Sequence, residues 1–399
     1  MLIQVYIIFK NWFNNSLQKL RHYFFRILLL TLKPYKKTNP YPKKIRKILL
    51  IRRNRLGDAI NILPIIYAIK KNYPHIEINI LANKYNSQIF EYCNAITHLY
   101  IINSSLWLGQ NFLFLNPTIR RLKKENFDLV VALGGYSSRL AKKTYFLNAK
   151  YSVGIGSDKY IFDLVYDKAV IFNKKKFKNQ IEEMAALIRA SGLSIPKKLP
   201  YTNLGLQNRP HKNWLAICPS SNRSESVYPP NLYVEVIKKI LKGGKFKKIT
   251  LFTMREKSSF KILTDYGCNH IVTDNLKLFI NELSKYQYVL TAEGGTAHIA
   301  GALHLSVFII SGTKNQFYWK PHAKNIKTFV NTNSVNKINP ELIAKIYMAR
   351  MDVMFDQTLF PFPEWSLTEI YTQTFIYHIR GIASEKGLAY LREKMKLKT

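Results

Sequence analysis

The sequence predicts an α/β protein with two doubly wound parallel sheets. Short apolar runs alternate with helical patterns, as is typical of parallel strands joined by crossover helices. The alternation stops at a proline-containing segment, residues 194–213, and then restarts. The chain has 399 residues, and single cores stop growing at roughly 250–300 residues. We therefore expect two domains joined by a linker, with a cleft between them.

The first half alternates from Lys47 onward. Strand patterns cover residues 47–51, 77–82, 96–102, 128–135 and 151–156. Helical patterns cover residues 59–72, 86–92, 117–126, 137–148 and 178–191. Gly192 follows the last pattern and suits the left-handed position after a helix. We assign residues 45–193 to the first domain and residues 194–213 to the linker.

The second half repeats the alternation. Strand patterns cover residues 214–218, 248–253, 270–273, 288–292 and 306–311. Helical patterns cover residues 230–242, 256–265, 276–286 and 297–303. We assign residues 214–335 to the second domain. Residues 336–399 are mostly helical in pattern, and we expect them to pack on the first domain or to form an interaction tail.

The formal net charge is +37. Such a charge favours polyanionic partners: nucleic acid, an anionic membrane surface or phosphorylated substrates. A general drift of composition towards lysine is the alternative explanation. The cysteines Cys93, Cys218 and Cys268 are scattered, so neither a disulfide framework nor a zinc site is predicted.

Residues 1–44 form a basic N-terminal arm. Lysines and arginines interrupt its apolar runs before they reach the ~18–20 residues that span a bilayer, and no small-residue cleavage site follows. Mixed apolar and basic residues over 1–35 suit an amphipathic helix at a membrane surface. A helix packed on the body of the protein is the alternative.

Asp58 is the only acidic residue among the first 76. It lies in LLIRRNRLGDAINILP, residues 49–64, where an apolar strand pattern passes into a helical one. From the residues alone, Asp58 is interpreted as the N-cap of a helix that starts at Ala59.

The segment TAEGGTAHIAGAL, residues 291–303, has a small-residue turn between a strand and a helix. Gly294 and Gly295 let the backbone approach a ligand, and the free amides and positive dipole at a helix start suit a phosphate. Glu293 is placed to accept sugar hydroxyls, and His298 to reach a phosphate. An ordinary tight turn and a packed histidine are the alternatives.

Two further turns follow strand patterns. The segment 217–230, ICPSSNRSESVYPP, offers hydroxyl donors, including Ser220 and Ser221, and Arg223 as a charge for a diphosphate. The segment 310–322 adds Thr313 at the same sheet edge. Solvated surface loops are the alternative for both.

Three common nucleotide motifs are absent from the sequence: G-x-G-x-x-G, G-x-x-x-x-G-K-[ST] and D-x-D. Their absence argues against a nicotinamide dehydrogenase, an ATPase and a metal-chelated nucleotide sugar, respectively. No helix-turn-helix, zinc finger or RNP-like motif supports nucleic-acid binding.

The segments IRRNRLGDAINILP, PSSNRSESVYPP and AEGGTAHIAGAL…FIISGT resemble, in order and separation, the three signature regions of the bacterial heptosyltransferases, glycosyltransferase family 9. The resemblance spans about residues 45–330. It implies a GT-B fold of two Rossmann-like domains facing a cleft, with the acceptor domain first. It also implies inverting, metal-independent transfer of heptose from ADP-heptose to the lipopolysaccharide inner core, on Kdo-lipid A or a heptosyl acceptor.

The resemblance implies that Asp58 is the catalytic base and that Gly57 lets the turn approach the sugar. Arg52, Arg53 and Arg55 would hold acceptor anions, or would keep Asp58 ionised. Donor binding falls to the residues of the second half: Ser220, Ser221, Arg223, Glu256, Glu293, Gly294, Gly295, Thr296, Ala297, His298 and Thr313. Glu256 would bind the ribose, and a solvated glutamate at a helix start is its alternative.

The chain departs from the family pattern at two places. Glu293-Gly294 replaces an aspartate followed by serine or threonine, and Ser226 stands where lysine is common. A different nucleotide-sugar donor therefore stays an alternative, as does a non-catalytic basic protein that binds nucleic acid or other anions. We expect an anionic glycolipid as the acceptor and a peripheral position at the cytoplasmic face of the inner membrane. We expect neither a cofactor beyond the nucleotide sugar nor a nucleic-acid partner.

Overall fold

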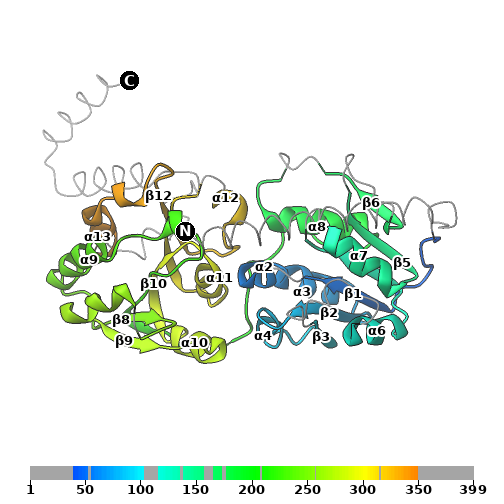
Figure 1. Cartoon of the computed structure of the whole chain (residues 1–399), viewed down its shortest axis with the longest axis horizontal. Helices are drawn as coiled ribbons and strands as arrows, with labels where there is room; N and C mark the ends of the chain where they lie inside the picture. The colour runs from blue at the N-terminus through cyan, green and yellow to red at the C-terminus, as the bar shows by residue number, and fades with distance from the viewer. Residues whose placement is uncertain are drawn as a thin grey trace, which may run out of the picture. The chain divides into compact units, whose positions relative to one another are not determined.

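The computed structural model describes residues 39–52, 55–102, 116–134, 138–156, 165–172, 177–206, 209–256, 258–313 and 316–348. The chain forms two compact units (Figure 1). Unit 1 extends to Leu206 and also includes residues 317–322, whereas residues 207–316 and those from Ala323 onward form unit 2. The amphipathic helix expected over residues 1–35 lies outside the described residues.

Unit 1 contains a parallel sheet of six strands in the order β3-β2-β1-β4-β5-β6. Its strands are β1 (Lys47–Ile51), β2 (Glu77–Asn83), β3 (His98–Ile102), β4 (Leu129–Ala132), β5 (Tyr151–Ile155) and β6 (Lys168–Val170). β1 pairs with β2 on one side and β4 on the other. The strand order reverses there, and ligands of open α/β sheets bind at the carboxyl ends of strands at such a switch point.

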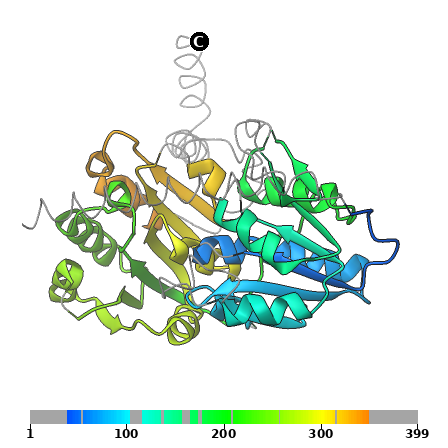
Figure 2. The same ribbon diagram turned by 45° about the vertical axis from the view of Figure 1, so that its right-hand side comes forward.

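Helices cover both faces of this sheet (Figure 2). They are α2 (Leu56–Asn61), α3 (Leu63–Asn72), α4 (Ser87–Phe90), α6 (Pro117–Lys124), α7 (Ser138–Leu147) and α8 (Gln180–Ala190). Alternate strand residues point to opposite faces. On one face Leu49 and Val130 join a core with Leu122 of α6 and Leu140 of α7.

Unit 2 repeats the topology of unit 1. Its six parallel strands lie in the order β12-β11-β10-β7-β8-β9, which is the same order when it is read from the other edge. The strands are β7 (His211–Cys218), β8 (Lys248–Thr253), β9 (Asn269–Val272), β10 (Tyr286–Ala292), β11 (Ser306–Ser311) and β12 (Ile326–Val330). The switch point of this sheet therefore lies between β7 and β10.

The helices of the second half are α9 (Pro230–Lys242), α10 (Leu276–Leu283), α11 (Gly295–Ala302), α12 (Gln316–Trp319) and α13 (Pro340–Met348), with 3-10 turns η5 (Ser224–Ser226), η6 (Ser259–Tyr266) and η7 (Val335–Lys337). α13 packs against α9. Ile343 and Ala344 of α13 are fully buried in the core of unit 2. This part of the predicted C-terminal helical segment therefore packs on the second half rather than the first, and residues 349–399 lie outside the described residues.

The α/β class with two doubly wound parallel sheets is confirmed. The edge strands β6 and β12 are additional to the predicted set; β6 has only three residues, and Lys327 and Thr328 interrupt the apolar pattern of β12. β7 begins at His211, inside the predicted linker, because its first residues are polar and give no apolar pattern. Asn213 in β7 has a positive φ of 64°, and the register with β10 shifts near it.

Two predicted helices differ in form. The helix expected over 59–72 begins at Leu56 and is divided at Ile62, because Pro64 near the start of α3 cannot donate a backbone hydrogen bond. The helix expected over 256–265 is the 3-10 turn η6, which ends at Gly267 in the left-handed conformation. Among the described helices, none combines the length and apolar character needed to cross a membrane.

Candidate active site

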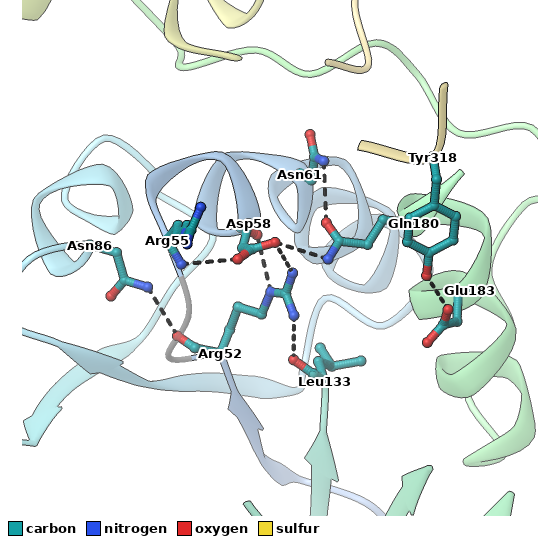
Figure 3. A network of polar contacts seen from close by, with 9 residues as sticks. All are labelled: Arg52, Arg55, Asp58, Asn61, Asn86, Leu133, Gln180, Glu183 and Tyr318. Carbon is teal, nitrogen blue, oxygen red and sulfur yellow. Dashed lines mark hydrogen bonds and ion pairs between the residues drawn. The ribbon is translucent and has the colours of Figure 1, made fainter. Parts of the chain in front are cut away.

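Asp58 lies just beyond the carboxyl end of β1, in the first turn of α2 (Figure 3). The interpretation of Asp58 as the N-cap is wrong, because the helix begins three residues earlier than expected and Arg55 is its N-cap. Asp58 still satisfies a free amide, since its Oδ2 accepts a hydrogen bond of 2.9 Å from the backbone N–H of Arg55. Asp58 is 9% exposed, so it lies at the boundary between the interior and solvent.

Arg52 is the main partner of Asp58. Its Nη2 donates to Asp58 Oδ1 at 2.8 Å, and its Nε donates to the backbone carbonyl of Asp58 at 3.2 Å. Its Nη1 donates to the carbonyl of Leu133, which follows β4. Burial lowers the pKa of the Arg52 guanidinium, while the charge of Asp58 opposes that shift. Only 1% of Arg52 is exposed, so its guanidinium contacts Asp58 and Leu133 inside the protein, and its role towards an acceptor anion stays a prediction.

Gln180, the first residue of α8, is a further hydrogen-bond donor to the carboxylate of Asp58. Its Nε2 donates to Asp58 Oδ1 at 2.9 Å, and its Oε1 accepts from Asn61 Nδ2 at 3.5 Å. The backbone carbonyl of Arg52 accepts a hydrogen bond from Asn86 Nδ2 at 3.4 Å. The buried amides therefore hold both members of the ion pair in place (Figure 3).

Glu183 lies one turn along α8 from Gln180 and is only 4% exposed. It accepts a hydrogen bond from the hydroxyl of Tyr318. Burial raises the pKa of Tyr318, and the hydrogen bond to Glu183 adds to that shift. Glu183 also favours the charged form of Arg52. Tyr318 belongs to the short segment 317–322 that is part of unit 1.

The other residues predicted for the acceptor side have different surroundings. Gly57 is buried within α2, whereas Arg55 is exposed. Arg53 lies outside the described residues. The structure therefore brings Arg52, Gly57 and Asp58 together in one turn, with the side chain of Arg55 at its solvent side.

In unit 2, α11 begins directly after the turn that follows β10. Gly294 is its N-cap, and a Cβ added to Gly294 would meet no atom within 4 Å. The next residues, Gly295 and Thr296, are partly exposed. The first amides of a helix have no intrahelical acceptor, so this open start can receive an anion. Ala297 is buried in the helix and His298 is partly exposed.

Glu293 joins three loops at the carboxyl edge of the second sheet. Its Oε2 accepts hydrogen bonds from the hydroxyls of Thr313, Ser311 and Ser226. Its backbone carbonyl accepts from Ser221 Oγ at 2.6 Å. The carboxylate therefore binds hydroxyls of the protein itself, and its role towards donor sugar hydroxyls stays a prediction.

Arg223 stands beside this cluster. Its Nη1 lies 3.6 Å from Glu293 Oε1, and its side chain is 28% exposed. The backbone N–H of Arg223 donates to Ser221 Oγ at 3.1 Å, whereas Ser220 is exposed. A partly exposed guanidinium in a loose ion pair can turn to a second anion with little loss of stability.

Glu256 stands apart from the predicted donor residues. Its carboxylate lies 3.0 Å from Lys261 Nζ, and its side chain is 67% exposed. The Lys261 hydrogen bond lowers the pKa of Glu256. Within the described parts of the chain no contact joins Glu256 to the Glu293 cluster, so its ribose-binding role stays a prediction.

The sequence model of glycosyltransferase family 9 (heptosyltransferase) matches residues 117–342, more than half of the chain. The chain belongs to glycosyltransferase family 9. The predicted family is thus confirmed, and the protein is a glycosyltransferase. A comparison with curated protein sequences gave no significant match.

Solved structures of other glycosyltransferases share the fold. Escherichia coli heptosyltransferase WaaC with ADP is 15% identical, with a TM-score of 0.63 over 75% of this chain and 98% of WaaC. E. coli ADP-heptose lps heptosyltransferase II is 14% identical, with a TM-score of 0.62 over 77% of this chain and 99% of that enzyme. The family 9 glycosyltransferase of Veillonella parvula is 13% identical, with a TM-score of 0.64 over 78% and 99%. These likenesses support the GT-B fold.

Sequence reasoning missed three residues at the candidate site: Gln180, Glu183 and Tyr318. Gln180 is separated from Asp58 by 122 positions, and nothing in its local pattern distinguishes it from other polar residues at a helix start. Tyr318 falls in the segment 310–322, which the sequence predicts only as a loop. In the residues that the structure describes, no group of three or more metal-ligating side chains occurs.

Proposed function

We propose that this glycosyltransferase transfers heptose from ADP-heptose to the inner core of lipopolysaccharide, with inversion at the anomeric carbon and without a metal ion. The observation that carries the proposal is the environment of Asp58. Its carboxylate is nearly buried at the switch point of the first sheet and accepts hydrogen bonds from Arg52, Gln180 and the backbone N–H of Arg55. A fixed carboxylate with one lightly bonded oxygen suits a general base.

In the proposed reaction, the acceptor hydroxyl attacks the anomeric carbon while the bond between that carbon and the β-phosphate oxygen breaks. The hydroxyl proton passes to Asp58, and ADP leaves with the electron pair of the broken bond. Negative charge grows on the diphosphate, and cationic or amide donors that are already in place stabilise it. Arg223 and the free amides at the start of α11 are the groups proposed for that role.

The proposed acceptor is an anionic glycolipid, either Kdo-lipid A or a heptosyl acceptor. The formal net charge of +37 supports a peripheral position at the cytoplasmic face of the inner membrane, because basic residues attract a protein to anionic lipid. No specific observation favours a nucleic-acid partner, and another nucleotide sugar is kept as an outcome of the test.

The donor is tested by thermal-shift titration with ADP, UDP, GDP and CMP at fixed salt. A ligand that binds only the folded state raises Tm by RT ln(1 + [L]/Kd). Of the four nucleotides, we expect only ADP to raise Tm. In a second assay, we expect the enzyme to release ADP from ADP-heptose when Kdo-lipid A is present, even with EDTA in the buffer. Preference for another nucleotide would overturn the donor, and no response to any nucleotide would contradict a donor site at α11.

A further inference from the structure

We infer that Gln180 is a positioning residue that aims the carboxylate of Asp58 and leaves Oδ2 as the oxygen that receives the acceptor proton. The inference rests on the proposed role of Asp58 as the base. It adds a residue on a distant helix and names the reacting oxygen atom.

The two oxygens of Asp58 are bonded unequally. Oδ1 accepts from two side chains, Arg52 Nη2 at 2.8 Å and Gln180 Nε2 at 2.9 Å. Oδ2 accepts only one hydrogen bond among the described residues, from the backbone N–H of Arg55 at 2.9 Å. A carboxylate oxygen has about two lone-pair sites. The lone pairs of Oδ1 are therefore filled, whereas Oδ2 keeps one for a proton.

The amide of Gln180 has one chemically consistent orientation. An ionised carboxylate only accepts hydrogen bonds, so the NH₂ group must face Asp58 and the carbonyl must face away. Asn61 Nδ2 lies 3.5 Å from Gln180 Oε1 and donates to it. Gln180 is 6% exposed and Asn61 is 1% exposed, so water does not compete freely for either amide.

α8 holds Gln180 at this place. Asn179 is the N-cap and accepts a hydrogen bond from the backbone N–H of Glu182. Glu183, on the same side of the helix, accepts a hydrogen bond from the hydroxyl of Tyr318. Figure 3 shows Gln180 between Asp58 and Tyr318, with its amide directed at the carboxylate. The Asn179 cap and the hydrogen bond between Glu183 and Tyr318 fix the start of α8, and with it the position from which the Gln180 amide extends to Asp58.

Arg52 alone does not set the plane of the carboxylate. Its contact with Oδ1 and the Arg55 contact with Oδ2 both come from residues close in sequence to Asp58. Among the residues that the structure describes, Gln180 supplies the contact to this carboxylate that comes from a separate element, and this contact resists rotation of the carboxylate about the Cβ–Cγ bond. A misplacement of about 1 Å at a reacting group can cost about 100-fold in rate.

The test compares Gln180→Met with Ser191→Ala. Methionine has a similar length and cannot donate to Asp58. Ser191 lies at the other end of α8, is buried and donates to the carbonyl of Ile188, so its replacement also removes one buried hydrogen bond. The enzyme is assayed with ADP-heptose and Kdo-lipid A, and Tm is measured for each variant.

For Gln180→Met we expect kcat to fall by about 10- to 100-fold, with both KM values within about twofold of the parent enzyme. Ser191→Ala should lower Tm to a similar extent and keep kcat. If Gln180→Met does not fold, Asn61→Ala serves as the second variant, because it frees Gln180 Oε1 and should lower kcat in the same direction. An unchanged kcat in these variants would overturn the inference.

Asp58→Asn separates the two hypotheses. Transfer at the parental rate by a folded Asp58→Asn enzyme would contradict the assignment of Asp58 as the base, and with it the proposed function. An inactive Asp58→Asn enzyme together with a normal Gln180→Met enzyme would keep the base and reject only the role of Gln180.

Discussion

Asp58 and Glu293 are both largely enclosed carboxylates at the carboxyl edge of a parallel sheet, but they are bonded in different ways. Asp58 is held through Oδ1 by a guanidinium and an amide, and Oδ2 has a single backbone donor. Oε2 of Glu293 accepts hydrogen bonds from hydroxyl groups on separate loops, and Arg223 lies near Oε1. The first arrangement leaves Oδ2 able to accept a further hydrogen bond, as the proposed base requires, whereas the second ties loops together.

Under the proposed function, the same sheet topology serves two tasks. The two sheets have the same strand order, yet Asp58 follows β1 whereas Glu293 follows β10. A reacting carboxylate needs a fixed direction and a free lone pair. A carboxylate that organises loops needs as many hydrogen-bond donors as the loops can supply.

The largest expected effect is that of Arg52→Met, which breaks the buried pair of the first site. It leaves Asp58 without its cation and the carbonyl of Leu133 without its donor. Removing one partner of a buried pair costs about 3–5 kcal/mol. We expect such a loss in the free energy of unfolding in urea. A loss below about 1 kcal/mol would mean that Asp58 does not depend on Arg52.

The next largest effect concerns two glycines around the Glu293 cluster. A Cβ on Gly312 would lie 1.9 Å from the carbonyl oxygen of Glu225, whereas a Cβ on Gly294 would meet open space. Gly312→Ala should therefore lower the free energy of unfolding by about 1–3 kcal/mol.

Gly294→Ala is its matched control for stability and should change the free energy of unfolding by less than about 0.5 kcal/mol. It should still weaken ADP binding by about tenfold, because the added methyl group enters the space before α11. Calorimetric titration with ADP measures this effect. Unchanged ADP affinity would place the diphosphate away from the start of α11.

A small effect on stability is also expected for Arg223→Met. Its ion pair with Glu293 is 3.6 Å long and partly exposed, and such pairs contribute about 0–1 kcal/mol. ADP affinity should fall by about tenfold, as for a charge-assisted contact of about 1.4 kcal/mol. A normal affinity for ADP in this variant would remove Arg223 from the donor site.

Much of the fold could be predicted because buried parallel strands have continuous apolar runs, as at 47–51 and 306–311. The strands β6 and β12 escaped prediction because β6 has only three residues and because Lys327 and Thr328 interrupt the apolar run of β12. The start of β7 escaped for a similar reason, since its first residues, His211 to Asn213, are polar.

The site was predictable where its residues adjoin a strand end, as Asp58 and Glu293 do. Long-range partners were not, because the pairing of Gln180 with Asp58 depends on how α8 packs and leaves no local pattern. The sequence leaves the role of Arg52 open between two interpretations, and its burial has no signature in the local pattern. The position of Glu256 likewise depends on the form of η6, which the helical pattern did not indicate.

The most direct measurement compares Asp58→Asn with Glu293→Gln in one experiment that records ADP affinity and the rate of heptose transfer from ADP-heptose to Kdo-lipid A. Both substitutions keep the size of the side chain and remove its charge. We predict that Asp58→Asn keeps ADP affinity and loses transfer by about 10²- to 10⁴-fold, whereas Glu293→Gln loses ADP affinity because the amide lacks the negative charge that pairs with Arg223 and strengthens the hydrogen bonds from the loop hydroxyls. Transfer by folded Asp58→Asn at the parental rate would contradict the assignment of Asp58 as the base.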